Sequence, residues 1–178
     1  MTRSLRTALM TRSLRTVLAA SLLLIACSSA KVLISKPATV PTGVDFSGNW
    51  VLTDTSGTGR HRDARELLVH VFFETGKSLK ITQTASGLFV SFDRSVVEEY
   101  RFGENRRISV GAISAERVSG WEGAAYVVET LDDDGAKLVE SWRLRDSGPR
   151  LQRNIKIWHK NQQKLILTQD FAQVLSGE

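Results

Sequence analysis

The chain has 178 residues, of which 24 are lysine or arginine and 19 are aspartate or glutamate, so its formal net charge is +5. Four of the arginines lie within residues 1–16, and the remaining 20 basic residues only balance the 19 acidic ones, which excludes the basic patch of a nucleic-acid-binding protein. The single cysteine excludes an intramolecular disulfide, and three histidines without metal-ligand spacing argue against a metal centre or any other cofactor.

Residues 1–26 have the pattern of an export signal. The four arginines, with no acidic residue among them, precede the apolar run 17–26. Ten residues of helix rise only about 15 Å, roughly half the hydrocarbon core of a bilayer, which is too short for a permanent membrane span. Residues 1–9 recur with one change as residues 10–18, so translation from either Met1 or Met10 leaves this signal intact.

The end of the apolar run, Leu24-Ile25-Ala26-Cys27, resembles the lipobox of bacterial lipoproteins. The resemblance implies cleavage before Cys27 and a diacylglycerol on its thiol. With serine rather than aspartate at position 28, it also implies transfer to the outer membrane, with the domain facing the periplasm. The alternative is an ordinary signal peptide cleaved after Ala30. We favour lipidation of Cys27, which would hold the protein on a membrane of the cell envelope by its lipid anchor.

Residues 27–44 contain Pro37 and Pro41 and predict a flexible tether, and residues 45–178 have the length of one domain. A first strand is expected at its start. After this strand, apolar residues at helical spacing predict one short amphipathic helix: Ala64, Leu67, Leu68, Val71 and Phe72. Because residues 67, 69, 71 and 73 are also apolar, a strand is the alternative here.

The remainder of the domain predicts strands joined by hairpins. Closing a turn at residues 84–87 pairs Gln83 with Leu88, Ile81 with Val90 and Leu79 with Phe92. Closing a turn at residues 146–149 pairs Leu144 with Leu151, Trp142 with Arg153, Glu140 with Ile155 and Leu138 with Ile157. Closing a turn at residues 159–163 pairs Ile157 with Leu165, Ile155 with Leu167, Arg153 with Gln169 and Leu151 with Phe171. A turn at residues 132–135 then places Leu131, Glu129, Val127 and Ala125 on the same apolar face.

Further short strands between residues 96 and 118 bring the total to about eight to ten, as in an all-β barrel or sandwich. The segment Gly48-Asn49-Trp50 resembles the Gly-x-Trp first strand of lipocalins and other calycins. This resemblance implies an antiparallel up-and-down lipocalin-like β-barrel, in which a basic residue near the end of the chain packs over Trp50. Arg153 is the candidate, although it lies on the penultimate expected strand and no second lipocalin motif is present. We favour the barrel over a two-sheet sandwich.

The apolar rows of the expected inner face are interrupted by polar residues. The candidate ligand-binding residues are Arg153, Glu140, Glu129, Trp142, Gln169 and Trp50. Buried ions need partners, so one interpretation is a structural plug in which an ion pair and an indole fill one end of the barrel. The other is a polar anchor in a lumen, where Arg153 binds the carboxylate or phosphate of a small amphipathic or hydrophobic ligand.

Catalysis ranks below both interpretations. Two carboxylates, Glu129 and Glu140, could act as acid and base, but the sequence offers no nucleophile, metal ligands or glycine-rich phosphate loop to accompany them. We therefore expect a binding protein rather than an enzyme. The alternative to ligand binding is an envelope lipoprotein with a filled barrel that acts on a partner protein through its outer surface.

Overall fold

The computed structural model describes residues 33–59, 74–110, 113–145 and 149–174. They form β1 (Gly48–Gly59), β2 (Ser78–Gln83), β3 (Gly87–Phe92), β4 (Val96–Arg101), β5 (Asn105–Val110), β6 (Ile113–Glu122), β7 (Ala125–Asp132), β8 (Ala136–Arg145), β9 (Arg150–His159) and β10 (Gln162–Val174). Within these ranges there is no helix, and so none long and apolar enough to cross a membrane. The expected export signal, Cys27 and the helix expected at residues 64–72 lie outside the described residues.

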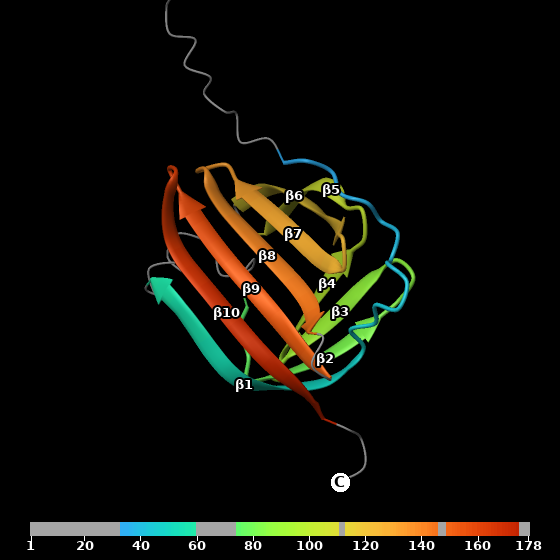
Figure 1. Cartoon of the computed structure of the whole chain (residues 1–178). Coiled ribbons are helices and arrows are strands. Elements are labelled where there is room, and N and C mark those ends of the chain that lie inside the picture. Colours follow the sequence, from blue (N-terminus) through green and yellow to red (C-terminus); the bar gives the residue numbers. More distant parts are fainter. Residues whose placement is uncertain (1–32, 60–73, 111–112, 146–148, 175–178) are drawn as a thin grey trace, which may run out of the picture. The chain divides into compact units, whose positions relative to one another are not determined.

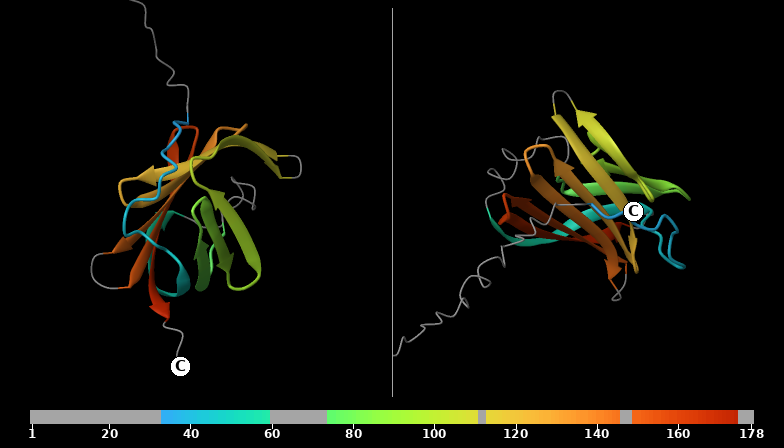
Figure 2. Two further views of the ribbon diagram at one scale, coloured as in Figure 1. Left: turned by 90° about the vertical axis from the view of Figure 1, so that its right-hand side faces the viewer. Right: turned by 90° about the horizontal axis from the view of Figure 1, so that it is seen from above.

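All ten strands belong to one antiparallel sheet, in the order β4-β3-β2-β1-β10-β9-β8-β7-β6-β5. Strands that follow one another in sequence are neighbours, except β4 and β5, and β1 pairs with β10, so the first and last strands lie together in the middle of the sheet. Figures 1 and 2 show that the sheet curls into a half-barrel. Among the described residues, β4 and β5 share no strand pairing, which leaves a seam between the two ends of the sheet. The all-β, antiparallel, up-and-down prediction is thus confirmed.

Side chains of β6 and β7 bridge this seam to the backbone of β4. The Tyr126 hydroxyl donates to the Arg101 carbonyl oxygen at 3.3 Å, and the Ser119 hydroxyl donates to the same oxygen. The Arg117 guanidinium lies 3.4 Å from the Glu99 carbonyl oxygen and 4.9 Å from the centre of the Tyr100 ring. The two ends of the sheet are therefore held together by side chains instead of a backbone ladder.

The registers expected for the β2–β3, β8–β9 and β9–β10 hairpins are confirmed at every predicted pair. Closing the last of them takes a two-residue turn, Lys160-Asn161, whose residues have positive φ angles of 48° and 65°. A β-bulge between Gln163 and Leu165 then restores the pairing of Ile157 with Leu165. Apolar alternation therefore predicted these registers correctly without the turn geometry.

The register expected between β7 and β8 is wrong by one residue. Tyr126 lies opposite Trp142, and Val128 lies opposite Glu140. The cause is the turn: Asp132 remains in β7, its carboxylate accepts a hydrogen bond from the Ala136 N–H at 2.7 Å, and three residues rather than four close the loop. Because side chains alternate along a strand, this difference moves Glu129 to the outer face of the sheet.

The core has two clusters at opposite ends of the strands. The first is mostly aromatic and contains Phe46, Trp50, Leu79, Ile81, Leu88, Val90, Phe92, Tyr100, Phe102, Trp121, Tyr126, Val128, Trp142, Leu151 and Phe171. The second is aliphatic, at the end where the β7–β8 and β9–β10 hairpins turn, and contains Ala115, Ala136, Leu138, Ile155, Ile157 and Leu165. Burying these side chains on the concave face stabilises the fold by about 25 cal/mol per Å² of apolar area removed from water.

Residues 33–44, which fall within the expected tether, pack against the sheet. The Pro37 carbonyl oxygen accepts a hydrogen bond from the Trp121 N–H at 2.9 Å, along the part of β6 that extends beyond its pairing with β5. A Cβ on Gly120 would lie 2.4 Å from that oxygen, so only glycine admits this close approach. Residues 33–44 are therefore not a free tether, and the other residues of the expected tether, 27–32, lie outside the described part of the chain.

The expected packing of Arg153 over Trp50 is not what the structure shows. Trp50 is buried, and its indole N–H donates to the Phe46 carbonyl oxygen at 3.0 Å. The Arg153 guanidinium instead lies 4.6 Å from the centre of the Trp142 ring and 4.9 Å from that of Phe92. The reason is topological: Trp142 is the direct cross-strand partner of Arg153, whereas Trp50 lies on β1, beyond β10.

Candidate functional site

A polar layer crosses the interior between the two apolar clusters. It is made by Arg153 on β9, Glu140 on β8 and Gln169 on β10, whose side chains all point into the concave face. Their exposed fractions are 0%, 1% and 3%. Three of the residues expected to form a ligand site, together with Trp142, are thus brought together as predicted, because the two hairpin registers that carry them are correct.

Arg153 is the centre of this layer. Its Nε donates to Glu140 Oε1 at 2.6 Å, and its Nη1 donates to the Glu74 carbonyl oxygen at 2.7 Å and to Gln169 Oε1 at 3.3 Å. Burial by itself lowers the pKa of Arg153, but the Glu140 carboxylate, together with Tyr100 and Glu98, outweighs burial, so its pKa is raised. The guanidinium therefore remains charged inside the protein.

Two donors in this layer have no hydrogen-bond partner. Arg153 Nη2 and Trp142 Nε1 are both buried and unbonded. A buried polar group left unpaired costs about 1–3 kcal/mol, so native proteins keep few of them. Because the guanidinium lies over the Trp142 indole, both donors belong to one small region of the interior. They are suited to an acceptor group, such as the oxygens of a carboxylate.

Glu98, an acidic residue on the inner face of β4, was not among the residues predicted from the sequence to form the site. Glu98 lies opposite Val90; its Oε2 accepts a hydrogen bond from the Tyr100 hydroxyl, and its Oε1 is buried without a partner. Burial, followed by repulsion from Glu140, raises the pKa of Glu98 to about 7. One signal was available: Glu98 and Glu99 are consecutive in a strand, so one of them has to face inward.

Tyr100 connects Glu98 to the polar layer. Its ring packs edge-on against Trp142, with the ring centres 6.4 Å apart. Burial raises the pKa of the Tyr100 phenol well above its ordinary value, and Glu140 and Glu98 raise it further, so the hydroxyl remains neutral and donates to Glu98. The wall around the two unpaired donors thus includes Tyr100 and, next to it, the Glu98 carboxyl group.

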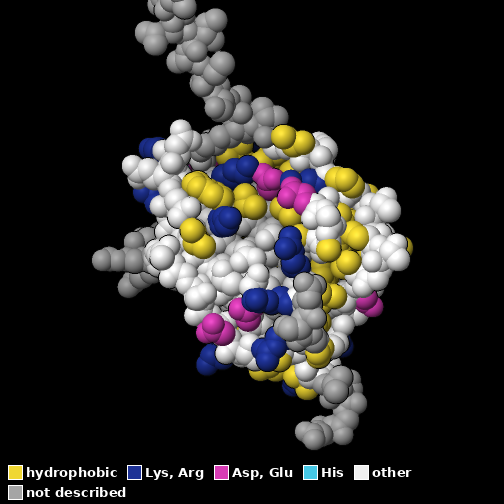
Figure 3. All heavy atoms as spheres, in the orientation of Figure 1, with side chains coloured by type: hydrophobic (Ala, Val, Ile, Leu, Met, Phe, Trp, Pro, Cys, Tyr) yellow, Lys and Arg dark blue, Asp and Glu magenta, His cyan; other side chains and the backbone are white. Residues whose placement is uncertain are grey.

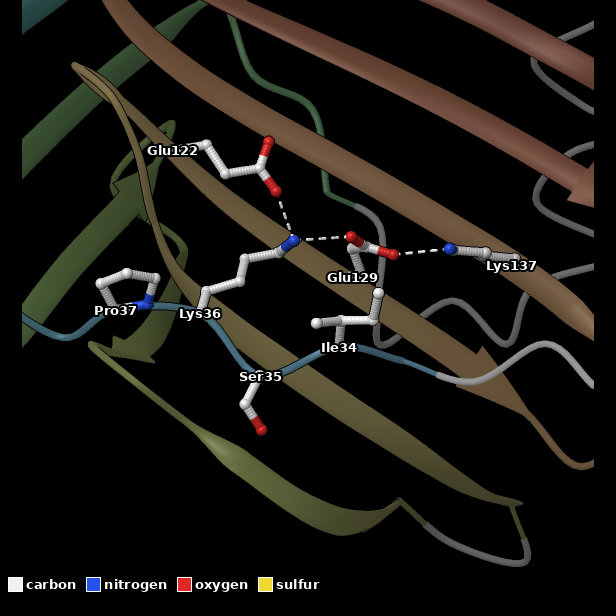
Figure 4. A pocket seen from close by; sticks show the side chains of 7 residues that line it. All are labelled: Ile34, Ser35, Lys36, Pro37, Glu122, Glu129 and Lys137. Atoms are coloured by element: carbon white, nitrogen blue, oxygen red, sulfur yellow. Dashed lines mark hydrogen bonds and ion pairs between the residues drawn. The ribbon is translucent and has the colours of Figure 1, made fainter.

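Glu129, which was expected inside, belongs to an ion-pair cluster on the outer face. Its carboxylate pairs with Lys36 Nζ at 2.7 Å and with Lys137 Nζ at 2.5 Å, and Lys36 also pairs with Glu122 (Figure 4). Burial opposes ionisation of Glu129, but the two lysines outweigh it and lower its pKa. These residues line a hollow of about 330 Å³ that is bounded by Ile34, Ser35 and Pro37. The cluster fixes residues 34–37 on the sheet.

Figure 3 shows the outer face of the sheet in the orientation of Figure 1, with acidic and basic side chains side by side near its top. Among the described residues, no group of three histidine, cysteine, aspartate or glutamate side chains is placed to hold a metal ion. Trp50 lies in the aromatic cluster, and its indole N–H already has an acceptor, the Phe46 carbonyl oxygen.

No family model matches the chain, and no curated protein matches its sequence. Solved structures do share its fold. Fatty-acid-binding protein 1 of Echinococcus granulosus has a TM-score of 0.51 and 13% identity, covering 73% of this chain and 98% of that one. Zebrafish ileal bile acid-binding protein, solved in complex with cholic acid, has a TM-score of 0.50 and 13% identity, covering 72% and 98%. A secretory abundant heat soluble protein of Ramazzottius varieornatus has a TM-score of 0.50 and 12% identity, covering 72% and 94%. At these identities the likeness shows the β-barrel fold alone.

Proposed function

We propose that the domain binds a small amphipathic ligand inside the half-barrel, with the ligand's acidic head group at Arg153 and Trp142. The observation that carries the proposal is the pair of buried, unbonded donors, Arg153 Nη2 and Trp142 Nε1, in the polar layer between the two apolar clusters. A carboxylate would satisfy both donors at once, and hydrogen bonds that involve a charged group are about twice as strong as neutral ones. In this proposal the protein is a binding protein and has no catalytic step.

The apolar body of the ligand would contact the aliphatic cluster. Leu138, Ile155 and Ile157 lie on the same strands as Glu140 and Arg153 and extend from the polar layer toward the β7–β8 and β9–β10 hairpins. A ligand with an acidic group at one end and a hydrocarbon body at the other would match this interior, because the polar layer lies next to the aliphatic cluster. The fold shared with a fatty-acid-binding protein and a bile acid-binding protein supports the same class of ligand.

We further propose that the protein works at the outer membrane, anchored through a lipid on Cys27 and facing the periplasm. Only residues 28–32 separate this cysteine from the first described residue. Five residues span at most about 18 Å when fully extended. An anchored domain would therefore stay close to the membrane surface, where amphipathic molecules are concentrated. Replacing Cys27 with serine should release the protein from membranes, and unchanged retention would contradict the anchor.

Ligand binding can be tested with a fluorescent fatty acid, 11-(dansylamino)undecanoic acid, titrated into the full chain. We expect saturable uptake at one probe per chain. Trp142→Phe keeps an aromatic ring over Arg153 but removes the indole N–H, and losing one hydrogen bond to a charged group costs about 1.5–3 kcal/mol, so affinity should fall about tenfold or more. Trp158→Phe, on the outer face opposite Lys137, is the matched control and should bind as the unchanged chain does. Absence of saturable uptake by the unchanged chain would contradict the proposal.

A second candidate function has one observation in its favour. The largest fully buried side chains include Trp50, Trp142, Tyr100, Tyr126 and Phe46, so aromatic rings fill much of the interior. A filled half-barrel would act through its outer face on an envelope protein. Native mass spectrometry of the protein from its own host separates the two functions, because a ligand-binding protein should carry a small acidic molecule and an interaction protein should carry none.

A further inference from the structure

Glu98 has an unusual place in the interior because it is an inward-facing acid without a basic partner of its own. Among the described residues, Arg153 is already paired with Glu140 at 2.6 Å, and Arg117 lies 3.4 Å from Glu104. The hydrogen bond that Glu98 receives comes from the neutral hydroxyl of Tyr100, and its Oε1 is buried without a partner. An ionised carboxylate would normally recruit a cation under such burial.

Charged groups face Glu98 from three other strands. Glu140 on β8 repels the carboxylate, whereas Arg153 on β9 and Arg117 on β6 attract it. On its own strand Tyr100 also favours the ionised form through its hydrogen bond. Burial and the repulsion by Glu140 prevail over these attractions, and the pKa of Glu98 is about 7. Glu98 therefore changes charge near neutral pH while Arg153 does not.

We propose that Glu98 selects the charge of the ligand's head group, accepting an acidic head group only when its own carboxyl is protonated. This inference rests on the proposed function, since it concerns the same site. The reason is electrostatic. Glu98 accepts a hydrogen bond from Tyr100, whose ring packs against Trp142, and Arg153 attracts its carboxylate, so Glu98 faces the same site as the two unpaired donors. Two carboxylates that share a low-dielectric site cannot both stay ionised. A protonated Glu98 can donate a hydrogen bond to the ligand, whereas an ionised Glu98 repels it. Above about pH 7, an anionic ligand would therefore be bound together with one proton from solvent.

The consequence is binding that weakens as pH rises. If the complex requires protonated Glu98, the fraction of protein that can bind falls roughly tenfold for each pH unit above about 7. The dissociation constant of an acidic ligand should therefore be about tenfold higher at pH 8 than at pH 6. A neutral ligand of the same length is not repelled by ionised Glu98, so its affinity should be the same at both pH values.

The test is a titration of the full chain at pH 6 and pH 8 with two probes, 11-(dansylamino)undecanoic acid and the corresponding alcohol, 11-(dansylamino)undecanol. We expect the acid to bind about tenfold more weakly at pH 8 and the alcohol to bind equally at both. Glu98→Gln should remove the difference for the acid and keep its tighter affinity at both pH values. Glu99→Gln is the matched control, because Glu99 is the next residue, faces outward and pairs with the exposed Arg101. It should keep the full pH dependence.

Two outcomes overturn the inference separately from the proposed function. Uptake of the acid with equal affinity at pH 6 and pH 8, or a tenfold difference that persists in Glu98→Gln, overturns the role of Glu98 and leaves ligand binding intact. Failure of the unchanged chain to take up either probe at either pH overturns the proposed function, and the inference with it.

Discussion

Arg153 holds a positive charge in the buried interior of the protein, where its side chain has no exposed surface. The desolvation of two buried ions costs several kcal/mol each, and their attraction recovers this cost only when the geometry is good and the remaining hydrogen-bonding atoms are satisfied. Arg153 and Glu140 meet at 2.6 Å, yet Nη2 of the arginine is unpaired. The pair therefore adds less to stability than its geometry suggests, and the unpaired donor is what a ligand would satisfy.

Removing one member of this ion pair while keeping the other should lower the stability of the fold substantially. Arg153→Met keeps most of the side-chain volume but leaves Glu140 buried without its cation, so we expect the free energy of unfolding to fall by about 3–5 kcal/mol. Urea unfolding measures it. The double variant Arg153→Met/Glu140→Leu removes both charges and should recover most of the loss.

The control is an exposed pair, Arg107 with Asp133, whose side chains are 54% and 61% exposed. Arg107→Gln should change the free energy of unfolding by less than about 1 kcal/mol. A cost for Arg153→Met as small as that of Arg107→Gln, or a double variant less stable than Arg153→Met, would show that the buried pair does not behave as described.

Glu98 should make stability depend on pH. Its pKa in the folded protein, about 7, lies above the ordinary value of 4.5, so the folded chain binds the proton more tightly than the unfolded chain. Stability therefore falls as pH rises from about 4.5 to 7, and the fall is complete above pH 7. Between pH 5 and pH 8 we expect the unchanged chain to lose about 2–3 kcal/mol more of its free energy of unfolding than Glu98→Gln does, measured by urea unfolding. Equal pH profiles for the two proteins would refute this.

The hairpins show which parts of the fold can be predicted from sequence. In β2–β3 and β8–β10 the apolar residues alternate on both strands, so only one register buries them together, and the predicted pairs are correct. In β7 the residues 125–128 are all apolar or aromatic, so alternation does not distinguish the two faces. The register there depends on whether Asp132 ends the strand or opens the turn, which is decided by its hydrogen bond to Ala136.

The same limit explains the errors in the candidate site. Arg153, Glu140, Trp142 and Gln169 were found together because they lie on strands of correct register. Glu129 was placed inside only because it lies on β7. Glu98 was missed because the charged residues that face it, Glu140 on β8 and Arg117 on β6, are distant from β4 in sequence.

The packing of residues 33–44 on the sheet requires the backbone at Pro37 to approach Gly120 closely, and a substitution at position 120 can disrupt it. In Gly120→Ala the new Cβ would lie 2.4 Å from the Pro37 carbonyl oxygen, so the segment has to move and the Trp121 N–H loses its acceptor. We expect hydrogen exchange at the Trp121 amide to accelerate at least tenfold. Gly123→Ala is the control: no atom lies within 4 Å of its Cβ, and its φ of 59° adds only local strain. Unchanged protection of Trp121 in Gly120→Ala would contradict the packing.

At the level of the whole molecule, the pairing of β1 with β10 closes the two ends of the chain against each other and moves the break in the sheet to the seam between β4 and β5. Composition and alternation predicted an all-β barrel, but not this seam, because backbone pairing between distant strands depends on how the whole sheet curls. The packing of residues 33–44 was likewise unpredictable, since prolines suit both an extended tether and a segment laid along a strand edge.

The central claim, that an acidic ligand binds inside the half-barrel at Arg153 and Trp142, is tested most directly by NMR of the four tryptophan indole N–H groups. Decanoate is added to the full chain, labelled with ¹⁵N, at pH 6. We predict that the Trp142 signal shifts and saturates at one ligand per chain, because its unbonded N–H gains an acceptor, while the signal of Trp158 on the outer face stays in place. A Trp142 signal that does not move at saturating decanoate would contradict the account.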